Sequence, residues 1–248
     1  MRPRAFKDLT QLPDSKFFEQ IARGTHLCAA SALMHWRDAL LLKKKNRRAG
    51  SEILRGYAEE EAAKFLILLD SVRCPRSPGD QFSRQLGYCA DHVAKGIYVK
   101  LYQNPAQVKF SKVRQLAASM RKDSYVDGPW TFRNDILTLR EERAYVDYVY
   151  DGDRYEWWDP MTHSRLFGRF RWFGMPRVLR VACSLRRSGF TSPASLKLVA
   201  KIWRKESIGD DWGRQDQCEL NEKTLREMRG KELLRRASTA VYEMVVDS

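Results

Sequence analysis

Two short stretches of the sequence hold residue types that can do acid–base chemistry. In the first, DHVAKGIY at residues 91–98, His92 and Lys95 stand three positions apart and share a face of a helix. Arg84 and Tyr88 fall within about 80° of that face if one continuous helix carries all four. Histidine titrates near neutral pH and cations hold a phosphodiester, so this stripe suits phosphate binding and acid–base catalysis. A solvated helix face with an inert histidine is the alternative.

The second stretch, YAEEEAAKFLILL, begins at Tyr57 and places three consecutive glutamates in an otherwise apolar helix. At about 100° per residue, Glu61 falls inside the apolar stripe, whereas Glu59 points away from it. A buried carboxylate is costly unless it is paired, so we expect a cationic partner opposite Glu61. The candidates are on the polar stripe: Arg84, His92 and Lys95. Such a cluster either fixes the packing of the helices or orients a catalytic histidine.

Helical periodicity, capping residues and prolines define the elements that must position these side chains. We expect helices over about 14–45, 50–72, 80–103, 106–122, 130–143, 161–173, 176–187, 193–206 and 219–246. Between residues 144 and 158, β-forming residues flank an Asp-Gly pair, which predicts one short β-hairpin. The sequence therefore predicts a mainly α protein, with a first domain over 1–160 and a basic helical extension over 161–248.

Composition limits the classes of function. Of the 248 residues, 43% are hydrophobic, which is typical of a folded globular protein, and 45 Lys and Arg outweigh 31 Asp and Glu to give a net charge of +14. That excess favours an anionic partner. The five cysteines form no CxxC pair and the four histidines have no ligand spacing, so we expect no metal site and no cofactor. Without a signal-peptide pattern or an apolar span of about 20 residues, we expect a cytoplasmic protein.

The stretch from Pro160 to Lys205 contains eleven Lys or Arg residues and no acidic residue. Arginines interleaved with aromatic residues suit RNA, through phosphate contacts and stacking. An amphipathic surface for anionic lipid and a surface packed against the rest of the protein are the alternatives. The candidate nucleic-acid-binding residues are Arg165, Arg169, Arg171, Arg177 and Arg180. The aromatic residues of the expected hairpin either stack on unpaired bases or hold the hairpin on a core.

The order of these motifs resembles the AbiV family of abortive infection proteins. EEAAK at 60–64 is followed by DHVAKGIY at 91–98 and by RAYVDYVYDG at 143–152, and the resemblance covers about residues 20–160. AbiV proteins are similar to the HEPN group of small α-helical proteins, many of which are dimeric, metal-independent ribonucleases. The resemblance thus implies a HEPN-like helical bundle that acts as a homodimer.

The resemblance also implies roles for single residues. It matches Glu60 and Lys64 to the acidic helix of the family, and Tyr145 and Asp147 to its hairpin. With Tyr88 and Arg143 added, we expect a structural polar cluster of Glu60, Lys64, Tyr88, Arg143, Tyr145 and Asp147. HEPN ribonucleases carry an arginine four to six residues before a histidine, whereas Arg84 and His92 have seven residues between them. Eight helical positions span about 12 Å, too far for both side chains of one subunit to grip one phosphate.

We therefore expect an antiphage protein that arrests growth or translation and whose partners are RNA or a ribonucleoprotein and a phage protein as trigger. If it is an enzyme, it cleaves RNA without a metal: His92 acts as general acid or base, Lys95 and Arg84 stabilise the charge, and Glu61 orients them. The alternative is a non-catalytic module that sequesters a phage, ribosomal or RNA partner through its basic carboxyl-terminal half. Binding to a membrane surface ranks below both.

Overall fold

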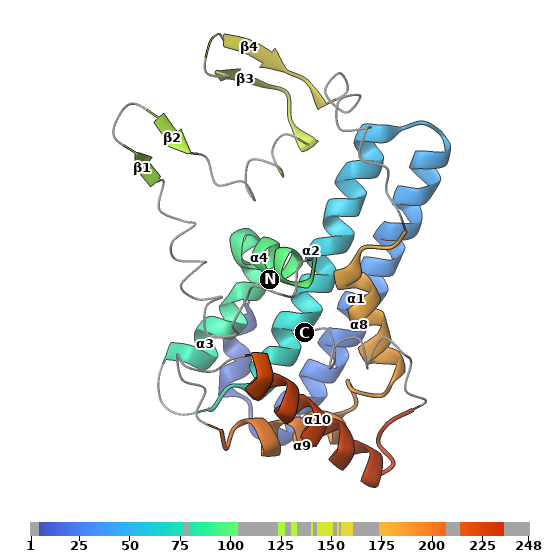
Figure 1. Cartoon of the computed structure of the whole chain (residues 1–248), viewed down its shortest axis with the longest axis vertical. Helices are drawn as coiled ribbons and strands as arrows, with labels where there is room; N and C mark the ends of the chain where they lie inside the picture. The colour runs from blue at the N-terminus through green and yellow to red at the C-terminus, as the bar shows by residue number, and fades with distance from the viewer. Residues whose placement is uncertain are drawn as a thin grey trace.

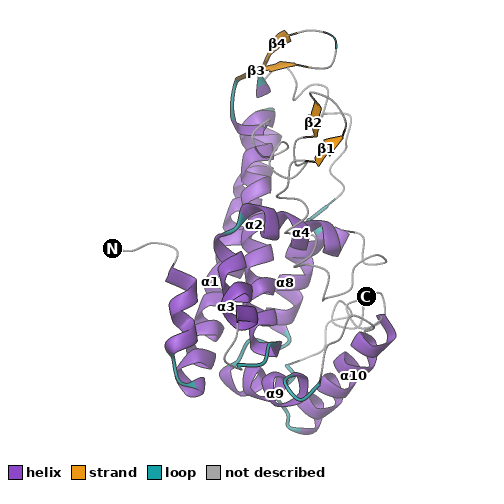
Figure 2. Cartoon of the chain, turned by 90° about the vertical axis from the view of Figure 1, so that its left-hand side faces the viewer, coloured by secondary structure: helices purple, strands orange, loops and turns teal. Residues whose placement is uncertain are grey.

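The computed structural model is mainly helical, which confirms the predicted class (Figures 1 and 2). It describes residues 5–76, 80–103, 124–126, 130–132, 140, 143–150, 153, 155–160, 174–206 and 214–235. A short 3-10 helix, η1 (Ala5–Gln11), precedes the first long helix. The expected helices over 106–122 and 161–173 lie outside the described residues.

A long helical hairpin runs through the molecule. α1 (Asp14–Lys44) and α2 (Arg48–Arg73) lie antiparallel and side by side (Figure 1). The turn between them is tight because Asn46 takes a left-handed conformation, with φ at 56°, which asparagine tolerates better than most residues. The helices also approach closely at Gly24, where an added Cβ would lie 3.2 Å from Leu68 Cδ1. α2 is therefore held against α1 both at the turn and far from it.

The helix expected over 80–103 is not continuous. Three elements occupy this range: α3 (Asp80–Gly87), the 3-10 helix η2 (Tyr88–Ala90) and α4 (His92–Gln103). The break occurs because Asp91 has extended backbone and its Oδ1 accepts hydrogen bonds from Val93 N at 3.0 Å and Ala94 N at 3.4 Å. A side chain that caps free N–H groups starts a new helix rather than continuing the old one. The prediction of a single helix was wrong at this point.

Helices after Pro160 share the core formed by the first half. They are α8 (Arg177–Arg187), α9 (Pro193–Trp203) and α10 (Arg214–Gly230). Ser192 caps α9 ahead of a proline at its first position, and Trp203, fully buried at the other end, donates from Nε1 to Thr224 Oγ1 of α10 at 3.0 Å. Buried side chains of all three helices belong to the same hydrophobic cluster as those of α1 and α2. The helix expected over 219–246 begins earlier, and residues 231–235 are not helical.

Two antiparallel hairpins, not one, lie among the described residues. β3 (Asp147–Tyr150) pairs with β4 (Tyr155–Trp158), which confirms the predicted hairpin. β1 (Ser124–Val126) pairs with β2 (Trp130–Phe132). The helix expected over 130–143 is therefore wrong for its first three residues, whose β-branched and aromatic side chains favour a strand.

A buried polar network joins α2 to three other helices. Arg73 Nη1 lies 3.0 Å from Asp70 Oδ1, and Tyr98 of α4 donates to Asp70 Oδ2 at 2.9 Å. Gln85 of α3 donates to the Tyr98 hydroxyl at 2.9 Å, and the Arg73 guanidinium stacks 4.2 Å from the ring centre of Trp203 in α9. Burial raises the pKa of Asp70 to about 6, against the opposing effects of Arg73 and Tyr98. The hydrogen bonds and ion pairs of this network therefore replace contacts with water that these side chains lose when they are buried.

Replacing Asp70 tests how much this network contributes to the free energy of unfolding. Asp70→Ala leaves the buried charge of Arg73 without its carboxylate, so we expect the free energy of unfolding to fall by about 3 kcal/mol or more. Asp38→Ala, on the exposed side of α1, should change it by less than about 0.5 kcal/mol. Urea unfolding followed by circular dichroism measures both, and equal midpoints for the two variants would contradict this assignment.

Candidate functional site

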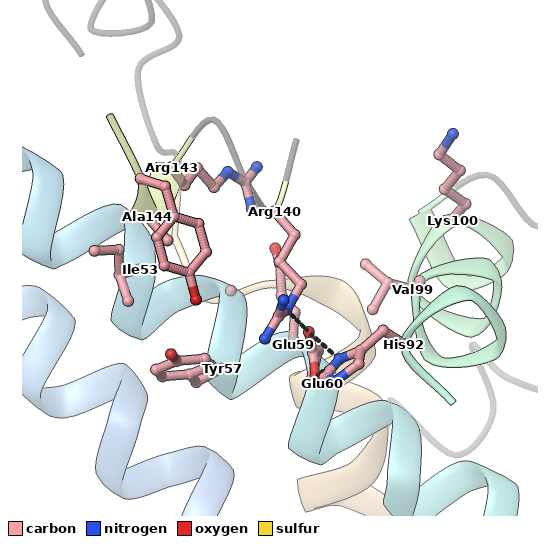
Figure 3. A pocket seen from close by; sticks show the side chains of 13 residues that line it. Ile53, Tyr57, Glu59, Glu60, His92, Val99, Lys100, Arg140, Arg143 and Ala144 are labelled. Atoms are coloured by element: carbon pink, nitrogen blue, oxygen red, sulfur yellow. Dashed lines mark hydrogen bonds and ion pairs between the residues drawn. The ribbon is translucent and has the colours of Figure 1, made fainter. Parts of the chain in front are cut away.

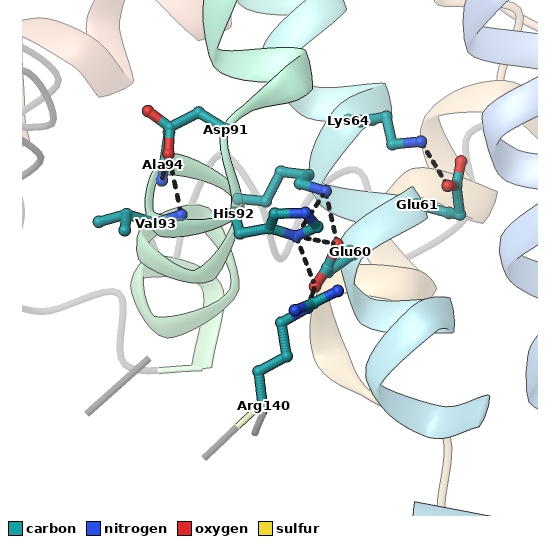
Figure 4. Close-up of polar contacts among 9 residues, drawn as sticks. Glu60, Glu61, Lys64, Asp91, His92, Val93, Ala94 and Arg140 are labelled. Carbon is teal, nitrogen blue, oxygen red and sulfur yellow. Dashed lines mark hydrogen bonds and ion pairs between the residues drawn. The ribbon is translucent and has the colours of Figure 1, made fainter. Parts of the chain in front are cut away.

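Glu60 is the centre of a polar cluster between α2 and α4 (Figure 4). Its Oε2 accepts a hydrogen bond from Lys95 Nζ at 2.5 Å and lies 3.0 Å from His92 Nδ1. Its Oε1 lies 3.2 Å from the same nitrogen of His92 and 3.5 Å from Arg140 Nε. One half-buried carboxylate thus gathers three basic side chains from two other segments.

The start of α4 positions two of these side chains. Asp91 caps the helix, so His92 is its first residue and Lys95 follows one turn later on the same side. Lys95 is only 5% exposed, and an ammonium group this deeply buried requires a paired acceptor. Glu60 supplies that acceptor, and the pair fixes α4 against α2.

The contacts of His92 fix its tautomer. A lone pair on Nδ1 would be repelled by the two Glu60 oxygens that face it, so Nδ1 carries a proton and donates it to Glu60. Because a protonated Nδ1 cannot accept, Lys95 Nζ, 3.2 Å from it, donates to Glu60 instead. Nε2 then keeps a free lone pair, which is the atom that a general base needs.

Burial and neighbouring charges set the protonation states of His92 and Glu60 at neutral pH. Burial lowers the pKa of His92 below its ordinary value of 6.5, and the charges of Lys95 and Arg140 add to this effect against that of Glu60. The position of His92 at the positive end of the α4 dipole acts in the same direction. Burial alone would raise the pKa of Glu60, but Lys95 and His92 outweigh it and hold that pKa below its usual range. An ionised Glu60 thus faces a neutral His92 at pH 7.

A cavity of about 150 Å³ lies beside this cluster, between α2, α4 and the segment that leads into β3 (Figure 3). Three cationic side chains line it: Lys100, Arg140 and Arg143. The other polar or aromatic side chains in its wall are Tyr57, Glu59, Glu60, His92 and Tyr145. A neutral imidazole beside three cations suits an anionic group such as a phosphate.

The predicted orientation of the three glutamates was wrong. Glu59, expected to face solvent, is 6% exposed and lies with Oε1 3.2 Å from Arg55 Nε; burial raises its pKa. Glu61 is 21% exposed and pairs with Lys64 of its own helix, on the side of α2 away from His92 (Figure 4). Two of the three partners expected for Glu61, His92 and Lys95, are therefore partners of Glu60, whereas Arg84 is not among the contacts of Glu60. The apolar stripe gave the wrong face because α2 is surrounded by other elements, and every residue from Phe65 to Arg73 is buried.

Other predicted site residues are distributed over several places. Arg84 and Tyr88 lie before the break that precedes α4, and neither lines the cavity, so the four-residue stripe does not exist as one face. Arg143 and Tyr145 do line it, whereas Asp147 begins β3.

The proposed nucleic-acid surface is described only in part. Arg165, Arg169 and Arg171 lie outside the described residues. Arg177 is half-buried at the start of α8, and Arg180 on the same helix is exposed.

Sequence reasoning missed four of the polar or aromatic side chains that line the cavity: Tyr57, Glu59, Lys100 and Arg140. Tyr57 stands one helical turn before Glu60, and Lys100 two turns after His92 on α4, so helical spacing could have identified both. No local pattern marks Arg140, which reaches Glu60 only through the fold. Within the described part of the chain, no group of three or more His, Cys, Asp or Glu side chains is placed to hold a metal ion.

The titration of His92 tests this geometry. The carboxylate charge of Glu60 raises the pKa of His92, so Glu60→Gln should lower that pKa below its wild-type value. Glu61→Gln removes the same charge from the adjacent residue, which pairs with Lys64, and should leave His92 nearly unchanged. Proton–carbon NMR of the imidazole over pH 4–8 measures both. A lower pKa in Glu61→Gln and not in Glu60→Gln would reverse the assignment.

Comparison with known proteins does not identify a family for this chain. No protein-family model, no curated protein and no solved structure matches the chain. Among the helices that are described, none is long and apolar enough to cross a membrane. The function therefore has to be argued from the chemistry of the cavity.

Proposed function

We propose that the cavity at His92 binds a phosphodiester of RNA and cleaves it without a metal ion. The main support for this proposal is the contact of Glu60 with His92 Nδ1, which leaves Nε2 free as a base. His92 lies in the wall of a cavity that is also lined by Lys100, Arg140 and Arg143. A base and cations are the two requirements for this reaction.

In this reaction the RNA supplies its own nucleophile. Nε2 of His92 takes the proton of a 2′-hydroxyl, the 2′-oxygen bonds to the adjacent phosphorus, and the bond from phosphorus to the 5′-oxygen breaks. Water protonates the leaving oxygen, and the product is a 2′,3′-cyclic phosphate. Arg140 and Arg143 stabilise the charge that grows on the phosphoryl oxygens, and Glu60 stabilises the imidazolium. In this scheme Glu60 takes the orienting role that the sequence assigned to Glu61, and Lys95 holds Glu60 in place.

The biological setting follows from the resemblance to AbiV proteins. In this proposal the protein acts in the bacterial cytoplasm as an antiphage factor, and RNA cleavage arrests growth or translation when a phage protein triggers it. RNA or a ribonucleoprotein is the target.

A non-catalytic binding module is the second candidate. It is favoured by the exposed arginines of α8, Arg180 and Arg187, within a stretch that lacks acidic residues. The two candidates differ in one respect: binding through α8 does not need a basic nitrogen on His92.

Loss of the base should separate the two candidates. His92→Ala should lower the rate of cleavage of total RNA in EDTA by about 10²-fold or more and should abolish growth arrest on overexpression. Wild-type activity should fall as the pH drops through the pKa of His92, below 6.5, because only the neutral imidazole accepts a proton. His26→Ala, on the exposed side of α1, is the control. Full toxicity of a folded His92→Ala variant would favour the binding module.

We also propose that the protein acts as a homodimer, and α1 supports this. Leu27, Met34 and Leu41 recur every seven residues on this 31-residue helix, and each is more than half exposed. Seven-residue spacing places these side chains along one seam, which is the pattern of helices that pair with each other.

A charge placed in the middle of this seam should weaken the dimer. Met34→Glu should raise the dimer dissociation constant by about tenfold or more, because the carboxylate would be buried without a partner. Lys197→Glu, on the exposed side of α9, is the charge-changing control. Sedimentation velocity over a range of concentrations measures both, and a wild-type chain that stays monomeric would exclude the seam as an interface.

A further inference from the structure

We propose that the exposed aromatic face of the β3–β4 hairpin binds an arginine- or lysine-rich polypeptide. This face consists of Tyr148, Tyr155 and Trp157, which are 56%, 66% and 69% exposed. The inference is separate from the reaction at His92 and holds whether or not the cavity cleaves RNA.

The strand register brings the three rings to one side of the hairpin. Tyr148 lies directly opposite Trp157 in the ladder, and their ring centres are 5.1 Å apart. Tyr155, the diagonal neighbour, stacks on Tyr148 at 5.8 Å with an angle of 18° between the rings. The rings thus order one another without being buried, so these three do not hold the hairpin on a core, which was one of the two alternatives for the aromatic residues of the hairpin. An ordered and exposed aromatic face is typical of a binding surface.

The charge of the hairpin indicates which kind of partner it binds. Between residues 145 and 159 the sequence has five acidic residues and one arginine, in a chain whose net charge is +14. Asp153, in the turn between the strands, is exposed. The net negative charge of this segment repels the phosphates of RNA and of anionic lipid, so the segment does not fit the base-stacking role that the sequence left open. Aromatic faces beside negative charge attract guanidinium and ammonium groups.

The same chemistry already occurs within this chain. Arg73 stacks 4.2 Å from the ring centre of Trp203, and Arg76 lies 4.9 Å from that of Phe17. In both places an arginine that faces an aromatic ring is also paired with an aspartate: Arg73 with Asp70 and Arg76 with Asp14. The hairpin offers exposed aromatic rings, in a segment with a net negative charge, to a cation from outside.

The hairpin is also directly connected to the segment that lines the cavity. Tyr145, two residues before β3, is 57% exposed and lines the cavity, and Arg143 just before it approaches α2 at Gly56. A polypeptide that engages the rings therefore lies beside the segment that supplies Arg140, Arg143 and Tyr145 to the cavity wall. Figure 2 shows this hairpin at the same end of the molecule as the turn between α1 and α2.

Binding of a defined peptide tests the proposal. The probe is a ten-residue peptide of alternating Arg and Ser, titrated into the full chain while tryptophan fluorescence is recorded. Trp157→Ala should weaken binding by about fivefold or more, Trp157→Phe by less, and Asp153→Asn should weaken it through loss of charge. Asp38→Asn, which removes a carboxylate charge from the exposed side of α1 and lies outside the dimer seam, should leave the affinity unchanged. Thermal melts confirm that each variant is folded.

Two further titrations and a measurement of self-association test the other possible occupants. A peptide of alternating Glu and Ser should not bind, and an oligouridylate of ten nucleotides should bind with the same affinity in wild type and Trp157→Ala. The proposal is overturned if the arginine peptide binds Trp157→Ala and wild type equally, or if oligouridylate binding is lost in that variant. It is also overturned if the variant disrupts self-association, because a second copy would then be the occupant. RNA cleavage by Trp157→Ala at the wild-type rate keeps this result distinct from any failure at His92.

Discussion

The carboxylates buried along α2 are the constraint on which the rest of the structure depends. A desolvated carboxylate must find cations or hydrogen-bond donors, and α2 presents Asp70 and Glu60 on the side that faces α4. Tyr98 of α4 donates to Asp70, and Lys95 of the same helix donates to Glu60. These two contacts lie one helical turn apart on α4 and fix both its height and its rotation against α2. The position of His92, at the start of α4, follows from them.

The same constraint explains why one carboxylate can serve both fold and chemistry. Glu60 pairs the buried Lys95, which is a structural need, and it also holds the Nδ1 proton of His92, which leaves Nε2 available as a base. Removing Glu60 would therefore disturb packing and titration together. Glu61, one residue away, pairs with Lys64 of its own helix and is the natural comparison for separating the two effects.

Charge is distributed unevenly around this site, and the distribution suggests a division of roles. The cavity wall carries Lys100, Arg140 and Arg143, which suit an anion, whereas the neighbouring hairpin combines exposed rings with an excess of acidic residues, which suits a cation. A single segment, residues 140–150, contributes to both surfaces. A ligand on the hairpin and a ligand in the cavity would therefore compete for, or cooperate through, the same backbone.

The sequence by itself determined the helical class, the bounds of α1, α2, α8 and α9 to within a few residues, and the hairpin at 147–158, because periodicity, capping and turn residues act locally. It also singled out His92 and Lys95 through their spacing. Only the tertiary structure decided which glutamate they meet. A helix enclosed by other elements has no single apolar face, so the orientation of Glu59, Glu60 and Glu61 depends on what packs around α2. The side chain of Asp91 decided that α3 and α4 are separate helices, and long-range folding brought Arg140 to Glu60, which no local pattern encodes.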